Sequence, residues 1–141
     1  MARHSRVANV NPPELGPARG FSHATVAGGY VWLGGQIGSD VHGNVQMRRD
    51  VGAQFRVAIR NVATALAACG CAPGDVVKLT YYVTDVLAYR RALRTIGEAY
   101  REVFAHHYPA TTLVGVQSLF HPDALVEIEC VALAPEVRSG E

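Results

Sequence analysis

The chain has 141 residues, of which 49% are hydrophobic and 18% charged, and its formal net charge at pH 7 is +1. This is the composition of an ordinary globular domain, and the near-neutral charge argues against nucleic-acid binding, which needs a basic excess. No apolar run approaches the roughly 20 residues that span a bilayer, the N-terminus lacks the apolar core of a secretory signal, and an odd number of cysteines favours a reducing compartment. We therefore expect a cytoplasmic protein with no nucleic-acid or membrane partner.

The first third of the chain is expected to form an extended arm followed by a β-hairpin. Residues 1–20 contain Asn11-Pro12-Pro13 and no periodic apolar pattern, so we interpret them as an extended N-terminal arm. The remainder, residues 21–141, is expected to form a single domain. At its start, residues 22–37 alternate around Gly28-Gly29, a pattern typical of two strands joined by a tight turn.

Two segments have helical periodicity. In residues 50–69 apolar side chains recur at steps of three and four, which predicts a helix capped by Asp50 and ended by Gly70. A second helix is expected over residues 86–104, with Asp85 as its cap. Its predicted buried stripe consists of Tyr89, Leu93, Ile96, Tyr100 and Phe104.

Three further strands are predicted, over residues 76–83, 111–116 and 125–133, each rich in β-branched or apolar residues. In the last one, Glu127 and Glu129 share one face because side chains alternate along a strand. The fold class is therefore α+β, a mixed β-sheet with two helices packed on one face. The other face carries valine and leucine and needs cover, which association with other subunits would supply.

Four segments, taken together, resemble the RidA (YjgF-type) family. They are Gly34-Gly35-Gln36-Ile37, the helical pattern from Gln54 to Gly70, the strand Val76-Val77-Lys78-Leu79-Thr80 with Tyr82-Val83 and Asp85, and the ending Pro109-Ala110 with Val126-Glu127-Ile128-Glu129-Cys130. The resemblance implies the chorismate-mutase-like RidA fold and a homotrimer with a central β-barrel and ligand clefts between subunits. For the best-known branch it also implies hydrolysis of enamines and imines to keto acids and ammonia.

The chain departs from the family at the ligand cleft. Thr111 occupies the position of the arginine that holds the substrate carboxylate, Leu113 that of a cysteine, and Phe21 that of a tyrosine. A threonine hydroxyl can donate one hydrogen bond but cannot neutralise a carboxylate. We therefore expect Phe21, Thr111 and Leu113 to line the cleft of a divergent branch, in which the family's activity on small 2-imino acids is weak.

Three other residues are candidates for the chemistry. By resemblance, Glu127 would orient water as a general base; the alternative is a strand glutamate paired across the sheet. His23 could assist proton transfer, or could be a histidine whose ring is satisfied structurally. Gly35 would present a backbone N–H to the ligand, or would only relieve strand twist. Glu129 is expected to be structural.

No metal or cofactor is predicted. Cys69 and Cys71 form a C-x-C pair without the four suitably spaced ligands of a zinc site, and Cys130 is expected in the core. Nucleotide-binding glycine motifs are absent from the sequence. Tyr81, Tyr89 and Tyr100 are interpreted as core or interface residues.

These observations favour a deaminase-like hydrolase acting on a small enamine, imine or related carbonyl compound. Its substrate would lack a carboxylate at the place of the family's arginine, or another cation would hold that carboxylate, with Arg19 as the nearest upstream candidate. Two alternatives stay open. One is a non-catalytic trimer that binds or senses a small molecule; the other is a dedicated step of a biosynthetic or catabolic pathway.

Overall fold

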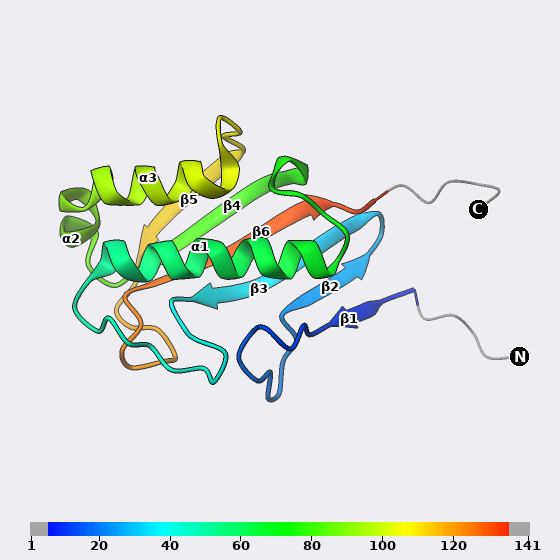
Figure 1. Ribbon diagram of the computed structural model, residues 1–141, viewed down its shortest axis with the longest axis horizontal. Coiled ribbons are helices and arrows are strands. Elements are labelled where there is room, and N and C mark those ends of the chain that lie inside the picture. The colour runs from blue at the N-terminus through cyan, green and yellow to red at the C-terminus, as the bar shows by residue number, and fades with distance from the viewer. Residues whose placement is uncertain (1–5, 136–141) are drawn as a thin grey trace, which may run out of the picture.

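The computed structural model describes residues 6–135 and forms one mixed sheet with its helices on a single face (Figure 1). The elements in chain order are β1 (Ala8–Val10), β2 (Ala24–Ala27), β3 (Tyr30–Ile37), α1 (Val51–Ala68), the 3-10 turn η1 (Pro73–Asp75), β4 (Val76–Val83), α2 (Val86–Arg91), α3 (Leu93–Phe104), β5 (Ala110–Gly115) and β6 (Val126–Leu133). The strand order is β1-β2-β3-β6-β4-β5. In the part of the chain that the structure describes, β4 and β5 are the only parallel pair of this sheet, and the other neighbouring strands are antiparallel. The predicted α+β class is confirmed.

The β2–β3 hairpin turns at the two glycines that the sequence indicated. Gly28 and Gly29 have φ angles of +62° and +82°, and Ala27 pairs with Tyr30 across the turn. Positive φ at both central positions is the geometry whose twist matches that of the flanking strands, and glycine adopts it at least cost.

The first helix begins and ends as predicted. The Asp50 carboxylate accepts a hydrogen bond from the Ala53 N–H at 3.0 Å, which satisfies one of the free donors of the first turn. At the other end Gly70 has φ +75°, and the N–H groups of Gly70 and Cys71 donate to the carbonyls of Ala67 and Leu66. This paired pattern is the Schellman motif, which satisfies the last helical carbonyls.

The second helix is broken, which corrects the expectation of one continuous helix. Asp85 does cap it, accepting from the Ala88 N–H at 2.9 Å. At Ala92, however, the N–H is shared between the carbonyls of Ala88 and Tyr89, and α3 starts at the next residue. The break turns Leu93 out of the predicted buried stripe, so that its side chain is 55% exposed.

The N-terminal arm contributes a strand that the sequence did not reveal. β1 pairs antiparallel with β2, in the register Asn9 to Thr25, and the Asn11 side chain accepts from the His23 N–H at 2.8 Å. Three residues are too few to show a periodicity, which explains why this strand escaped prediction.

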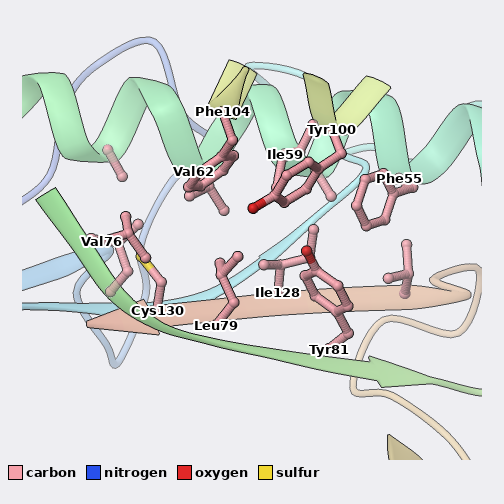
Figure 2. Packing of buried hydrophobic residues seen from close by; sticks show 14 of the residues in the cluster. Phe55, Ile59, Val62, Val76, Leu79, Tyr81, Tyr100, Phe104, Ile128 and Cys130 are labelled. Atoms are coloured by element: carbon pink, nitrogen blue, oxygen red, sulfur yellow. The ribbon is translucent and has the colours of Figure 1, made fainter. Parts of the chain in front are cut away.

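The core lies between the helices and one face of the sheet. Figure 2 shows Phe55, Ile59 and Val62 of α1 above Leu79 and Ile128 of the sheet, and all five are fully buried. The opposite face has no helix over it. There Trp32 is 49% exposed and Leu133 48% exposed, so the described part of the chain leaves this open face uncovered.

Candidate functional site

Glu127 lies on the open face of the sheet, near its centre. Its neighbours in register are Ile37 on β3 and Tyr82 on β4. The residues on either side of it, Val126 and Ile128, are fully buried beneath the helices. Alternation along β6 therefore directs the Glu127 carboxylate away from the core, as predicted.

Gly35 provides the space that the Glu127 side chain occupies. The β3–β6 register shifts between Leu33 and Gln36, which is a β-bulge with Gly35 inside it. A Cβ atom at Gly35 would overlap the Glu127 carboxylate. A side chain at position 35 would therefore displace this carboxylate from its place over the backbone, a reason for glycine that differs from the ligand approach expected from the sequence.

The two glutamates of β6 have different environments. The Tyr82 hydroxyl donates to Glu129 Oε1 at 2.6 Å, and this bond raises the pKa of the Tyr82 phenol. Within residues 6–135 the Glu127 carboxylate has no hydrogen bond or ion pair. Burial, and secondarily the charge of Glu129, raise the pKa of Glu127 above its ordinary value. A carboxyl group with a raised pKa and no internal partner is suited to proton transfer.

His23 is a buried residue whose ring is already occupied. Its Nε2 lies 2.6 Å from the Gly16 carbonyl oxygen, and its Nδ1 lies 3.1 Å from the Gln36 amide nitrogen. A carbonyl can only accept and an amide NH₂ can only donate, so Nε2 carries the proton and Nδ1 accepts. The ring is a neutral bridge between the arm and β3, which favours the structural alternative for this residue.

Phe21 stands beside His23 but faces solvent. Its ring meets the His23 ring edge-to-face with centroids 5.5 Å apart, and its side chain is 56% exposed. An exposed phenylalanine next to the bulge is available to a ligand or to another protein surface.

Thr111 and Leu113 lie on the other side of the sheet from Glu127. In the parallel β4–β5 register they pair with Leu79 and Tyr81, which point toward the helices. The Thr111 hydroxyl donates to the Pro109 carbonyl at 2.9 Å. The structure thus does not bring Glu127 and Thr111 together within one chain.

A cavity opens between α3 and the β4–β5 edge, on the helix side of the sheet. Its volume is about 530 Å³, and its lining includes Thr111 and Arg101. Five of the eleven lining residues are aromatic, namely Phe55, Tyr81, Tyr89, Tyr100 and Tyr108. The sequence predicted Tyr81, Tyr89 and Tyr100 as core or interface residues, and all three are buried. It did not indicate that they also line a cavity, because they come together from β4, α2 and α3.

Residues 6–135 contain no group of three or more histidine, cysteine or carboxylate side chains able to hold a metal ion, and the three cysteines in this range are free thiols. No described helix is both long and apolar enough to cross a membrane.

The comparisons with known proteins agree on one family. The family model described as endoribonuclease L-PSP matches residues 12–134. The chain belongs to this family. It is the RidA (YjgF-type) family that the sequence motifs resemble, and the match includes the bulge at Gly35, Thr111 and both β6 glutamates.

Individual relatives share the sequence over most of their length. A RutC family protein of Pyrococcus horikoshii is 32% identical over 121 residues, covering 86% of this chain and 90% of the relative. The human 2-iminobutanoate/2-iminopropanoate deaminase is 29% identical over 122 residues, covering 86% and 83%.

Solved structures of the family have the same fold. The crystal structure of E. coli TdcF with bound serine is similar with a TM-score of 0.79 and 26% identity, over 91% of this chain and 99% of that one. A YjgF/YER057c/UK114 family member of Mycobacterium tuberculosis has 35% identity and a TM-score of 0.66, over 82% and 87%.

Proposed function

We propose that this RidA-family chain is a cytoplasmic hydrolase that deaminates an imine or enamine, with Glu127 as the acid–base residue. The observation that carries the proposal is the Glu127 carboxylate, which lies over Gly35 with a raised pKa and has no hydrogen bond or ion pair to residues 6–135. Relatives named as 2-iminobutanoate/2-iminopropanoate deaminases, from human and Dermatophagoides farinae, support this class of chemistry.

The reaction needs one group that can both accept and return a proton. Water adds its oxygen to the carbon of the protonated imine while Glu127 takes one of the water protons, which gives a carbinolamine. The carboxyl group then protonates the carbinolamine nitrogen. As the carbon–nitrogen bond breaks, the carbinolamine hydroxyl gives its proton to Glu127, and a carbonyl compound and ammonia leave. A pKa closer to neutrality improves a carboxylate in both steps. Gly35, without a register partner in either neighbouring strand, would donate its N–H to the polar end of the substrate.

The complete site would need two copies of the chain. Glu127 and Gly35 lie on the open face of the sheet, whereas Thr111 and Leu113 lie on the helix side of the edge strand β5. One copy therefore cannot present both pairs to one small molecule. We propose that a homotrimer combines the open face of one subunit with the β5 edge of the next, and that Phe21 contributes to the wall of this cleft.

Other activities are less well supported. The family description includes the word endoribonuclease, but a chain with a formal charge of +1 has no basic excess to bind phosphates along RNA. The alternative of a non-catalytic ligand-binding trimer is favoured by one observation, the threonine in place of the family's carboxylate-binding arginine.

The test compares hydrolysis and binding in the same variants. A panel of imines made in situ by an amino-acid oxidase is offered to the wild type, to Glu127→Gln and to the control Glu14→Gln, which changes an exposed carboxylate in the arm. We expect Glu127→Gln to lower turnover at least about a hundredfold, the lower end of typical acid–base contributions. The control should retain full activity. If the wild type accelerates none of the imines, or if Glu127→Gln is as active as the wild type, the proposal is wrong.

A further inference from the structure

Arg101 differs from several other arginines of the helices, which form ion pairs. Arg56 and Arg60 pair with Glu102, and Arg94 pairs with Glu98. The Arg101 guanidinium makes no hydrogen bond or ion pair with any residue in the range 6–135. It nevertheless lines the aromatic cavity, together with Thr111.

Gly97 determines where this guanidinium lies. Residues four apart on a helix are neighbours on its surface, and Gly97 precedes Arg101 by four on α3. A Cβ atom at Gly97 would lie 3.1 Å from the Arg101 Nη1 atom. The guanidinium of this exposed residue therefore lies over the bare backbone of Gly97, at the rim of the cavity.

Two buried hydroxyl groups also lack partners in this cavity. Tyr81 is 6% exposed and Tyr89 8% exposed, and neither phenol has a hydrogen bond among the described residues. No fully buried side-chain oxygen there is left unsatisfied, so both hydroxyls must reach the open space of the cavity that they line. Burial raises the pKa of Tyr89 to about 12, which keeps its hydroxyl a neutral donor.

Three further aromatic rings, those of Phe55, Tyr100 and Tyr108, line the same cavity. The Phe55 and Tyr81 rings meet edge-to-face with centroids 5.4 Å apart, and Figure 2 shows them pointing toward each other from α1 and β4. A volume of about 530 Å³ is within the range of sites for ligands larger than a three- or four-carbon acid. Such a cavity suits a flat apolar group, which gains contact with the faces and edges of the rings.

We propose that this cavity receives a 2-imino acid with an aromatic side chain, and that Arg101 binds its carboxylate in place of the arginine that position 111 lacks. The inference rests on the proposed function, because it names the substrate class of the same site. The guanidinium offers the two parallel N–H donors that a carboxylate accepts. The tyrosine hydroxyls face the aromatic ring and can bond a polar substituent on it.

Binding of a keto-acid product tests the anion site independently of turnover. Calorimetry on the native assembly would measure the Kd of phenylpyruvate, with pyruvate as the small comparison. We expect phenylpyruvate to bind more tightly than pyruvate and Arg101→Gln to weaken its binding at least about tenfold. Arg94→Gln, which alters an exposed arginine on the same helix, should leave the Kd unchanged. Equal affinity of Arg101→Gln and wild type for phenylpyruvate would overturn the proposal.

Gly97→Ala tests the placement of the guanidinium while the charge is kept. The new methyl group lies where Nη1 now approaches, so phenylpyruvate should bind more weakly although Arg101 is present. An unchanged Kd would contradict the proposed placement.

Hydrolysis separates this inference from the function on which it rests. The imine made from phenylalanine should be hydrolysed faster than 2-iminopropanoate, and the reverse order would overturn the substrate class. Arg101-dependent binding without hydrolysis of any imine would support the anion site and contradict the proposed function.

Discussion

The family resemblance places a neutral residue, Thr111, where a substrate-binding arginine is expected. Thr111 donates to the neighbouring Pro109 carbonyl, and its side chain carries no charge. The cation that lines the same cavity, Arg101, is ten positions earlier, on a helix rather than on the edge strand. A carboxylate held from α3 would meet a different wall, which is consistent with a different side chain on the substrate.

The ionised side chain of a second residue, Glu127, is predicted to lower the stability of the fold at neutral pH. Its pKa is raised in the folded chain from an ordinary value of 4.5, so the folded state binds a proton there more tightly than the unfolded state. The free energy of unfolding should therefore fall as the pH rises from about 4.5 through the raised pKa. Glu127→Gln removes this penalty, and we expect it to raise the Tm by about 1–3 °C at pH 7.5.

The difference in Tm should shrink at pH 4, where the carboxyl group of the wild type is also protonated. Differential scanning calorimetry at both pH values provides the measurement, with Glu14→Gln as an exposed control. A Glu127→Gln variant that melts below the wild type at pH 7.5 would show that the carboxylate is stabilised by contacts other than those described.

Among the elements, α1 contributes to the tertiary fold through both apolar and polar side chains. Its apolar stripe is buried against β3 and β6, and one polar residue, Gln54, is buried completely. The Gln54 amide donates to the Met47 and Asp123 carbonyls and accepts from the Leu125 N–H. These three bonds attach the start of the helix to the loop that leads into β6, and so position the strand that carries Glu127.

Ile59→Ala tests the helical phase on which this arrangement depends. Ile59 is 0% exposed, and truncation of such a residue leaves a cavity, so we expect a loss of about 2–5 kcal/mol in the free energy of unfolding. Chemical denaturation gives the value. Arg60→Ala is the neighbouring control, because its exposed pair with Glu102 should contribute only about 0–1 kcal/mol. A loss below about 0.5 kcal/mol for Ile59→Ala would contradict the observed packing.

For the whole molecule, the open face of the sheet predicts self-association. Trp32, Val114 and Leu133 are each more than a third exposed, which is an apolar surface that a monomer rarely leaves in water. Light scattering should give a mass of about three times the chain mass of 15.1 kDa. A stable species of chain mass at micromolar concentration would exclude the trimer and the two-copy site with it.

Dilution provides a second measurement of the same assembly. The sequence contains one tryptophan, and it lies on the open face, so dissociation should move its fluorescence emission to longer wavelength. An emission maximum that stays constant while the mass falls would place the interface elsewhere.

The sequence by itself determined the elements whose signals are local. Each of these signals depends on residues that are near one another in the chain. They are the helix caps at Asp50 and Asp85, the glycine turn at residues 28–29, and the alternation along the strand that directs Glu127 away from the core. The family motifs were likewise visible because they preserve residue identity and spacing.

Only the tertiary structure decided which of these residues meet. Strand order and register place His23 between Gly16 and Gln36, and leave space over Gly35 for the Glu127 side chain. They also place Glu127 and Thr111 on opposite sides of the sheet. Such contacts join residues that are distant in sequence or depend on side-chain packing. Contacts of either kind produce no periodic pattern in a single amino-acid sequence.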